Sequence, residues 1–203
     1  MNLFTLGITG GTGAGKTVAL RTLKSLGVLT LDCDAIYHEL LLDSAELKSE
    51  LESRFTGVLR DGEVDRKQLG KIVFNDTSAL LELNAITHKY VNIEIERRTD
   101  EWAANGGKAI AIDAIALIES TLAKGCDIVI GICAPLETRI SRIMNRDNIT
   151  RKQAEMRINA QKPDSYYKDN CNHMLENNYE NQADFEEKCK EFFGKLLSAQ
   201  GII

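Results

Sequence analysis

The chain carries near its start the stretch Gly10-Gly11-Thr12-Gly13-Ala14-Gly15-Lys16-Thr17, which fits the pattern G-x-x-x-x-G-K-[ST]. An apolar run of strand length, residues 3–9, precedes this stretch, and an apolar helical pattern over 18–26 follows it. Strand, glycine-rich loop and helix in this order predict a loop that binds the phosphates of a nucleotide. The alternative is a glycine-rich turn without a ligand, and the flanking strand and helix argue against it.

Each residue type in the stretch has a use in phosphate binding. Glycines let the backbone curl until successive N–H groups point into one concavity, and the helix that begins near Lys16 adds the positive end of its dipole. We expect Lys16 to reach the outer phosphates and the Thr17 hydroxyl to bind Mg²⁺. The predicted nucleotide-binding residues of this segment are Gly11, Thr12, Gly13, Ala14, Gly15, Lys16, Thr17 and Val18.

The charge balance limits the partners of the chain. Its 203 residues include 30 acidic and 25 basic side chains, which give a net charge of −5. Nucleic acid and anionic membranes call for a basic face, so we expect neither as a partner. No apolar run approaches the roughly 18 residues of a membrane helix and no signal-peptide pattern opens the chain, so we expect a cytoplasmic protein. Five cysteines without a C-x-x-C pair argue against a zinc site.

Apolar runs and helical patterns alternate along the chain. The predicted strands cover residues 3–9, 28–31, 108–112, 127–133 and 173–176. Helices are predicted over 16–26, 114–124, 136–146, 150–161 and 182–197, with Gly27 ending the first and Thr150 capping the fourth. This alternation predicts an α/β fold in which helices cover both faces of a parallel sheet.

Residues 35–102 form a long, strongly charged helical block between the second and third predicted strands. Its breaks are the Thr56-Gly57 region, the Asp61-Gly62 turn and the Asn75-Asp76-Thr77 cap signal, and we expect no strand inside it. An insertion of this size beside a nucleotide site is well placed to hold a second substrate. The alternative is a plain structural appendage.

Asp32 and Asp34 stand at the end of the second predicted strand, at the edge where open α/β sheets bind ligands. Carboxylates there can hold Mg²⁺ through water or accept a proton from an attacking hydroxyl. We expect at least one of the two to be functional. The alternative is helix capping, because Asp is a favoured N-cap residue and a helical pattern begins at Ala35.

Asp113 ends the apolar run over 109–112, a pattern that places a carboxylate near the Mg²⁺ of a phosphate loop. Ala114 follows it where motor-type ATPases often have Glu, and the chain has no N-K-x-D motif for guanine recognition. Both absences weaken the classes that transfer phosphate to water. The residues therefore favour transfer of a phosphoryl group to a bound hydroxyl over transfer to water.

Arg139, Arg142 and Arg146 recur at i, i+3 and i+7 and so share one face of a predicted helix. Such a row can close over a transferring phosphoryl group and neutralise its charge. The alternative is a solvated face paired with Glu137 and its neighbours. The same choice between a substrate contact and an ordinary surface residue holds for three further side chains: Arg157, Gln161 and His88.

Together these residues resemble the dephospho-coenzyme A kinase family in order and spacing along nearly the whole chain. The resemblance is carried by the glycine-rich loop, Asp32-x-Asp34, Gly62-Glu63-Val64-Asp65-Arg66-x-x-Leu69, His88, Asp113 with Glu119, and Arg142-x-x-x-Arg146 through Gln161. It implies a P-loop kinase fold with a five-stranded parallel sheet flanked by helices. Within a single domain over 1–203 it implies a helical acceptor-binding insertion at about 35–105 and a lid at about 139–165.

The implied reaction moves the γ-phosphoryl group of ATP, with Mg²⁺, to the 3′-hydroxyl of dephospho-CoA and gives coenzyme A. Asp34 would face the acceptor hydroxyl, with Asp32 beside it near the metal, and Asn177 falls in the loop that contacts adenine. The implied catalytic residues are Lys16, Asp32, Asp34 and Arg142; the implied metal ligands are Thr17 and Asp32. Beyond the glycine-rich loop, the implied ATP contacts are Arg146 and Asn177, and the implied acceptor contacts are Asp34, Arg66, His88 and Asp113.

Three positions depart from the family pattern. Val18 stands where a second hydroxyl residue usually follows the loop lysine, and Lys89 and Ile115 stand where the family has prolines. The last two concern the acceptor side, so two alternatives stay open. One is a related kinase for another nucleoside or nucleotide, and the other is a nucleotide-binding regulatory module without turnover.

Overall fold

The computed structural model of the protein describes residues 3–74, 76–114 and 116–203. Ile115, one of the three departures from the family pattern, lies outside these residues. The chain divides into two compact units, of which the first comprises residues 1–31 and 102–203 and the second comprises residues 32–101. The chain therefore leaves the first unit after Leu31 and returns to it at Trp102.

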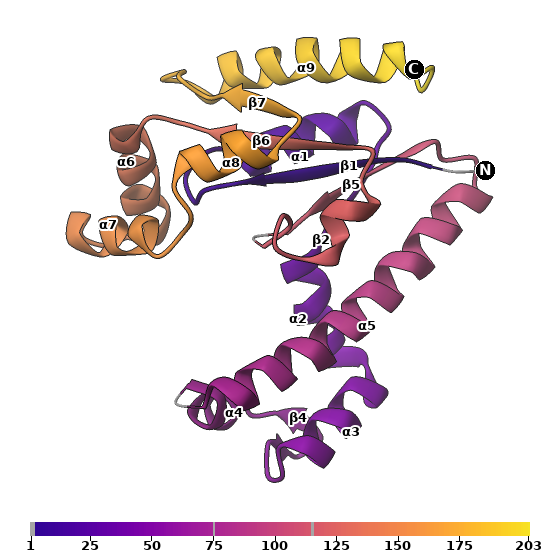
Figure 1. Cartoon of the computed structure of the whole chain (residues 1–203), viewed down its shortest axis with the longest axis vertical. Helices are drawn as coiled ribbons and strands as arrows, with labels where there is room; N and C mark the ends of the chain where they lie inside the picture. Colours follow the sequence, from indigo (N-terminus) through magenta and orange to yellow (C-terminus); the bar gives the residue numbers. More distant parts are fainter. Residues whose placement is uncertain (1–2, 75, 115) are drawn as a thin grey trace. The chain divides into compact units, whose positions relative to one another are not determined.

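The first unit is an α/β structure whose strands and helices alternate (Figure 1). The strands of its sheet are β1 (Phe4–Gly10), β2 (Leu29–Asp32), β5 (Ala109–Asp113), β6 (Ile128–Cys133) and β7 (His173–Glu176). Its helices are α1 (Lys16–Ser25), the 3-10 helix η1 (Thr121–Gly125), α6 (Leu136–Asp147), α7 (Arg151–Asn159), α8 (Asp164–Asn170) and α9 (Gln182–Ala199). Every one of these helices is too short or too polar to cross a membrane, as are the other helices of the described residues.

The five strands form one sheet in the order β2-β5-β1-β6-β7. β1 is the central strand, and it pairs in parallel with β5 on one side and with β6 on the other. In the registers Gly7 lies opposite Ile112 of β5 and Val129 of β6. Open parallel sheets bind ligands at the carboxyl ends of such central strands, and β1 ends there at Gly10.

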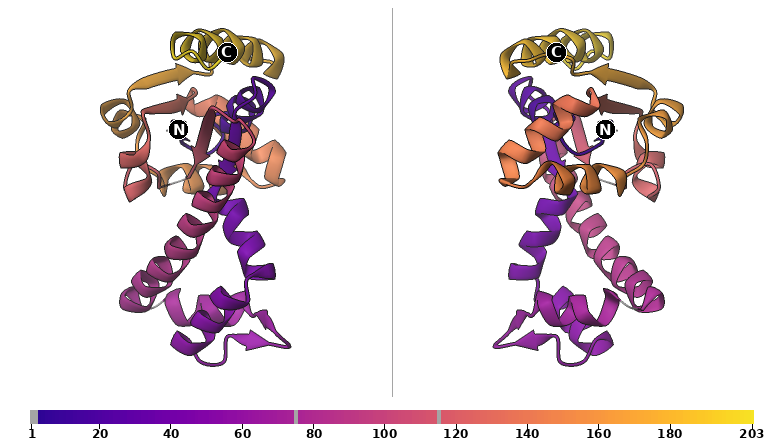
Figure 2. Two further views of the ribbon diagram at one scale, coloured as in Figure 1. Left: turned by 90° about the vertical axis from the view of Figure 1, so that its right-hand side faces the viewer. Right: turned by 90° about the vertical axis from the view of Figure 1, so that its left-hand side faces the viewer.

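The two faces of β1 pack against different parts of the unit. Leu6 and Ile8 are fully buried in a core that α1 and α9 complete, and α9, in yellow, lies along this side of the sheet (Figure 1 and Figure 2). Gly7 faces the opposite way, where an added Cβ would lie 2.7 Å from Leu117 and 3.0 Å from Cys126. Because side chains alternate along a strand, the pattern shows a sheet buried on both faces.

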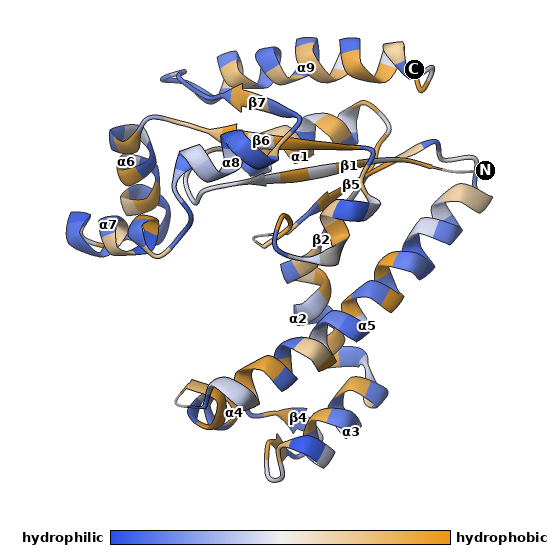
Figure 3. Ribbon diagram, viewed as in Figure 1, coloured by the Kyte–Doolittle hydropathy of each residue, from blue (hydrophilic) through white to orange (hydrophobic). Residues whose placement is uncertain are grey.

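Helix α9 covers the sheet with one apolar stripe. Its buried residues recur every four positions and are Phe185, Cys189, Phe193 and Leu197. Figure 3 shows the resulting apolar and polar bands along α9. Full burial of each large apolar side chain contributes about 1.5–3 kcal/mol, so the stripe fixes α9 on the sheet.

The second unit is mainly helical. Its elements are α2 (Cys33–Asp43), α3 (Ala45–Arg54), β3 (Leu59–Arg60), β4 (Glu63–Val64), α4 (Arg66–Phe74) and most of α5 (Thr77–Ala104). It has a hydrophobic core of its own, in which Leu47, Leu51 and Val58 have no exposed surface. A separate core agrees with the division of the chain into two units.

The predicted sheet is confirmed. All five predicted strands are present, and each begins within one residue of its predicted start. Gly27 ends the first helix with φ 81°, a conformation that glycine adopts without strain, and Thr150 caps α7 in a capping box with Gln153.

The expectation that no strand interrupts residues 35–102 is wrong. β3 and β4 pair in an antiparallel hairpin around Asp61 and Gly62, which have φ 52° and φ 81°. Positive φ at both central residues is the signature of the Asp-Gly hairpin turn. The strands have two residues each, too few to show an alternating pattern in the sequence.

The α-helix predicted over 114–124 is also wrong. Residues 116–119 form turns and only η1 is helical, as a 3-10 helix capped by the Ser120 hydroxyl. The short helix α8, in contrast, was not predicted, because seven residues hold too few apolar positions to reveal a period.

Glu94 on α5 provides a test of the second unit through pH. Its carboxylate accepts hydrogen bonds from Arg97 at 2.8 Å and from Arg98 at 2.7 Å, which hold its pKa at about 2. We expect Glu94→Gln to lower the free energy of unfolding by about 1–2 kcal/mol at pH 7. The stabilisation is complete above the ordinary carboxyl pKa, and it is lost as the pH falls from about 4.5 toward 2.

Urea unfolding of both proteins at pH 7, 4 and 3 measures this loss. Glu101→Gln on the same helix is the control, because that side chain is 65% exposed and its loss should change stability by less than about 0.5 kcal/mol. A difference between wild type and Glu94→Gln that stays constant from pH 7 to pH 3 contradicts the assignment.

Candidate functional site

The glycine-rich stretch forms a tight loop between β1 and α1. Gly10, Gly13 and Gly15 have φ values of 136°, 76° and 112°, which side chains other than glycine rarely adopt. Within the loop the Ala14 N–H donates to Gly11 O at 3.2 Å, and Ala14 itself is buried. The sequence therefore forms the curled backbone that phosphate binding requires.

Close packing forbids side chains at two ends of this loop. A Cβ at Gly10 would lie 2.1 Å from the carbonyl oxygen of Ile132 on β6. A Cβ at Gly15 would lie 2.3 Å from Nδ2 of Asn177, just after β7. Glycine is required here by neighbouring backbone and by a buried amide, as well as by φ.

The first turn of α1 presents its positive end to the loop. No acidic side chain lies in this turn, and Val18 N–H is the first to bond back, to Gly15 O at 3.0 Å. The Lys16 ammonium donates to Gly10 O at 2.9 Å and so spans the loop. Thr17 is exposed at the start of the helix. Lysine charge and helix dipole together favour an anion in the loop.

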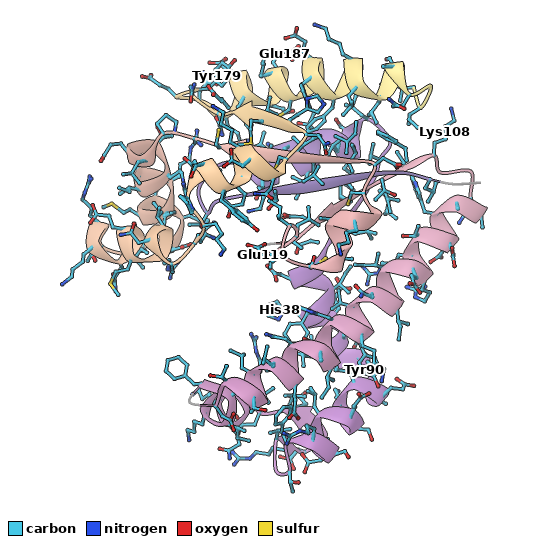
Figure 4. All side chains as sticks on the ribbon, viewed as in Figure 1. His38, Tyr90, Lys108, Glu119, Tyr179 and Glu187 are labelled. Atoms are coloured by element: carbon cyan, nitrogen blue, oxygen red, sulfur yellow. The ribbon has the colours of Figure 1, made fainter. Side chains whose placement is uncertain are left out.

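Arg142 on α6 and Asn177 bind the outer side of the loop. The Arg142 guanidinium donates to Gly13 O at 3.3 Å and Ala14 O at 3.4 Å, and to Asn177 Oδ1 at 3.2 Å. It also donates to the carbonyl oxygen of Tyr179, which follows β7 (Figure 4). Asn177 is 2% exposed and its amide donates to Ala14 O at 2.8 Å. Two predicted site residues thus meet at the loop backbone.

Arg139 and Gln161, which are not among the site residues that the family resemblance implies, also bind the loop. Arg139 Nε donates to Thr12 O at 2.9 Å, and Gln161 Oε1 accepts from Thr12 N–H at 2.7 Å. The arginine row and the position of Gln161 were noted in the sequence, but helical spacing alone could not separate loop contacts from solvated residues. Thr12, expected to bind nucleotide, has both of its backbone polar groups on protein side chains.

Arg146 differs from Arg139 and Arg142. Its side chain is 61% exposed and pairs with Asp147 at 2.7 Å. Asp147 also pairs with Arg157, and the two guanidiniums, Arg146 first, lower the pKa of the Asp147 carboxyl. The arginine row is therefore split: two members hold the loop and the third lies in a surface ion pair.

Asp32 has the capping role that the sequence left open. Its Oδ1 accepts from Asp34 N–H at 2.9 Å and from Ala35 N–H at 3.0 Å, at the start of α2. One carboxylate is enough for this cap, so the cap gives no reason for an acid at position 34. Asp34 lies in the first turn of α2, where a negative charge is favoured.

Asp113 ends β5, as predicted, and its Cα is in register with Ile8 of the central strand. It is half-buried, as a carboxylate near the nucleotide site would be. Glu119, labelled in Figure 4, follows six residues further on. Burial is the main cause that raises the pKa of Tyr166 and Tyr167, and the negative charge of Glu119 raises both further.

The motif from Gly62 to Leu69 belongs to the second unit. Gly62 forms the hairpin turn, Leu69 is buried, and Asp65 caps α4 by accepting from Lys67 and Gln68 N–H at 3.0 Å. Gly62, Leu69 and Asp65 therefore have structural roles, whereas Arg66 is exposed at the first position of α4. Its residue type is not explained by the local structure.

His88 is exposed on α5, which continues unbroken through the next residue. Lys89, the departure from the family proline, donates to Glu50 at 2.7 Å and lies over the Tyr90 ring. Tyr90 donates to the same carboxylate at 2.7 Å (Figure 4). The replacement of proline by lysine thus ties α5 to α3 within the second unit.

Comparison with known proteins agrees with this geometry. The family model for dephospho-CoA kinase (CoaE) matches residues 4–183. The chain belongs to the dephospho-CoA kinase family. A dephospho-CoA kinase of Dehalococcoides mccartyi is 37% identical over 79% of this chain and 81% of its own length. That of Latilactobacillus sakei is 31% identical over 85% of this chain and 86% of its own.

Solved structures match nearly the whole chain. The dephospho-CoA kinase of Campylobacter jejuni matches with a TM-score of 0.70 and 26% identity, covering 97% of this chain and 98% of its own. TT1252 of Thermus thermophilus matches with a TM-score of 0.78 and 27% identity over 97% and 99%. A shikimate kinase of Acinetobacter baumannii, 16% identical with a TM-score of 0.53, shows that the fold is that of P-loop kinases.

The protein oxygen atoms beside the loop fit a Mg²⁺ ion whose other ligands are substrate phosphates and water. Within the described ranges, no cluster of three or more His, Cys, Asp or Glu side chains is arranged to hold a metal ion. Mg²⁺ in kinases needs only one or two protein oxygens beside waters and phosphates. The exposed Thr17 hydroxyl supplies such an oxygen next to the loop, so the residues fit the ion that the dephospho-CoA kinase family implies.

The Asp32 cap can be tested by stability. We expect Asp32→Ala to lower the free energy of unfolding by about 1 kcal/mol, because two N–H groups of α2 lose their acceptor. Asp32→Asn should stay close to wild type, since Asn caps as well as Asp. Urea unfolding with far-UV circular dichroism measures both, and Asp34→Asn serves as a control that leaves the cap intact. Equal losses for Asp32→Ala and Asp32→Asn contradict the capping role.

Proposed function

We propose that the protein transfers the γ-phosphoryl group of ATP to the 3′-hydroxyl of dephospho-CoA, giving coenzyme A and ADP. The observation that carries the proposal is the family match over residues 4–183, which includes an intact phosphate loop. The reaction belongs to coenzyme A synthesis, so its proposed place is the cytoplasm. A kinase for a different nucleoside or nucleotide is the alternative that an acceptor panel separates.

The phosphate loop supplies the binding side of the proposed reaction. The segment from Gly11 to Val18 would hold the triphosphate through the Lys16 ammonium and backbone N–H groups. Three of its N–H groups, those of Thr12, Ala14 and Val18, already donate within the protein, to Gln161, to Gly11 O and to Gly15 O. Thr17 and Asp32 would hold Mg²⁺, which when bound neutralises charge on the β- and γ-phosphates. Lys16 already lies across the loop on Gly10 O and would exchange this carbonyl for phosphate oxygen.

Asp34 is the proposed base. As the new bond between the ribose oxygen and the γ-phosphorus forms, the bond from that phosphorus to the bridging oxygen of ADP breaks, and Asp34 receives the hydroxyl proton. Its support is twofold: the family pattern Asp32-x-Asp34, and a helix cap that Asp32 completes alone. Arg66, His88 and Asp113 are the proposed acceptor contacts.

The arginines have different proposed parts. Arg142 touches the outer side of the loop and is proposed to offset charge on the transferring group as a catalytic residue. Arg146 and Asn177 are the proposed contacts to ATP beyond the loop. We also propose that residues of about 35–105 form the acceptor-binding insertion and those of about 139–165 the lid. Support for the lid comes from Arg139, Arg142 and Gln161, which all bind the loop backbone.

The proposed function is tested by direct assay. The purified protein with ATP, Mg²⁺ and dephospho-CoA should release ADP and form coenzyme A, followed by coupled ADP detection and mass spectrometry. Adenosine, AMP and 3′-deoxy dephospho-CoA test which acceptor and which hydroxyl are used. Product with adenosine or AMP but not dephospho-CoA supports the alternative kinase, and ATP binding without any product supports the regulatory module.

Two substitutions separate binding from chemistry. Lys16→Ala should weaken ATP binding and abolish transfer, since in the proposed complex the ammonium would contact the phosphates. Asp34→Asn should leave the ATP dissociation constant within about twofold and lower kcat by about 10²–10⁴, the range for loss of a general base. Calorimetry and initial rates measure the two effects.

Matched controls are available on the same elements. Asp43→Asn lies on α2 with Asp34, and Lys124→Ala removes an exposed lysine of the first unit. Neither should change kcat or ATP binding by more than about twofold, the limit expected for surface residues away from a site. Full activity of Asp34→Asn removes Asp34 from the mechanism.

A further inference from the structure

Arg139 is a buried arginine with two directed contacts. It is 4% exposed, and its guanidinium bridges the phosphate loop and α8. Nε donates to Thr12 O at 2.9 Å, and Nη1 donates to Asp164 Oδ1 at 3.0 Å. Buried guanidinium groups are costly unless paired, so a side chain that served only to fill space here would be apolar.

The loop is shaped to admit this guanidinium. A Cβ at Gly11 would lie 2.3 Å from Nη2 of Arg139, and a Cβ at Gly13 would lie 2.9 Å from its carbonyl oxygen. Two of the four loop glycines therefore lie directly against Arg139. Nη2 is buried and has no hydrogen-bond partner among the described residues.

Among the residues that the structure describes, Arg139 has one ion-pair partner. Asp164 on α8 makes the ion pair, and its side chain is 51% exposed. Cys133 on β6 and Tyr167 on α8 also lie close enough for the guanidinium to lower their pKa, although burial raises both. The positive charge thus stays near the loop, and its ion-pair partner in the described part of the chain is half exposed to solvent.

The contact to Thr12 O fixes the orientation of one peptide. In a planar trans peptide the C=O and N–H point in opposite directions, so a bond to Thr12 O turns the Gly13 N–H to the other side. Gln161 holds the preceding peptide through Thr12 N–H at 2.7 Å. Both peptides that flank the Thr12 Cα are therefore set by side chains from residues 139–161.

We propose that Arg139 is a positioning residue, which presets the Thr12–Gly13 peptide so that the loop N–H groups are ready for the triphosphate. The proposal rests on the proposed function, in which ATP occupies this loop. Arg139 acts through the backbone, and no direct contact to the phosphates is assigned to it. Preset donors bind without reorganisation, so loss of Arg139 should weaken ATP binding more than it weakens the fold.

The test compares Arg139→Lys and Arg139→Met. Lysine keeps the charge and can pair with Asp164, but it lacks the forked donors that reach Asp164 and Thr12 together. We expect both variants to raise the ATP dissociation constant and the KM for ATP about tenfold, the factor that ~1.4 kcal/mol of lost interaction gives. The KM for dephospho-CoA should stay within about twofold, and Arg139→Lys should be thermally more stable than Arg139→Met.

Arg151→Met is the matched control. Arg151 also lies on this part of the chain, but its ion-pair partners are Glu137 at 2.6 Å and Glu155 at 2.7 Å, neither of which belongs to the loop. Its loss should leave ATP binding unchanged. Arg139 variants that lose thermal stability with unaltered ATP affinity overturn the proposal, as does restoration of wild-type affinity by lysine, which would reduce the role of Arg139 to its charge.

A double-mutant cycle with Gly11→Ala tests the contact itself. The added methyl group would displace the guanidinium, so Gly11→Ala should weaken ATP binding clearly in the wild type and much less in an Arg139→Ala background. If Gly11→Ala weakens ATP binding equally in both backgrounds, the substitution does not act through Arg139, which contradicts the proposal. Calorimetric ATP binding needs no acceptor, so failure of the wild type to phosphorylate dephospho-CoA would reject the proposed function and leave this test readable.

Discussion

The loop between β1 and α1 depends on glycine, because neighbouring atoms leave no room for a Cβ at several of its positions. Gly10 is closed in by the backbone of β6, and Gly15 by the Asn177 amide after β7. The neighbours that crowd Gly10 and Gly15 thus come from β6 and from the segment just after β7, two strands that lie on one side of β1 in the sheet. The parallel sheet order builds the phosphate site, because it brings the ends of β6 and β7 to the end of β1.

The cations around this loop act on its carbonyl groups. Arg139 binds Thr12 O, and Arg142 binds Gly13 O and Ala14 O. Each carbonyl held from outside turns the N–H of the same peptide the opposite way, since peptides are planar and trans. These contacts set the directions of the Gly13, Ala14 and Gly15 N–H groups, of which that of Ala14 donates to Gly11 O within the loop. The same contacts polarise the peptides and make those N–H groups stronger partners for an anion.

Patterns that depend on local sequence were predictable, and contacts that depend on tertiary packing were not. The sheet followed from apolar runs and the loop from its glycines, but the two-residue strands β3 and β4 are too short to show a period. The sequence around Asp32 is compatible with a functional carboxylate and with a helix cap, and the hydrogen bond from Asp34 N–H assigns the cap. Equal helical spacing made Arg139 and Arg146 look alike, although one is 5% and the other 61% exposed at the side chain.

Net charge is a poor guide to the potential at this site. The chain carries −5 in total, and its exposed arginines such as Arg146 and Arg151 are neutralised by carboxylates at 2.7 Å and 2.6 Å. Arg142 is different, because all its hydrogen-bond acceptors in the described part of the chain are uncharged carbonyl and amide oxygens. Burial lowers its pKa from the usual value of a guanidinium, which still stays charged at neutral pH. Its charge is therefore balanced by no neighbouring acid, and an anion in the loop is the counter-charge that this arrangement lacks.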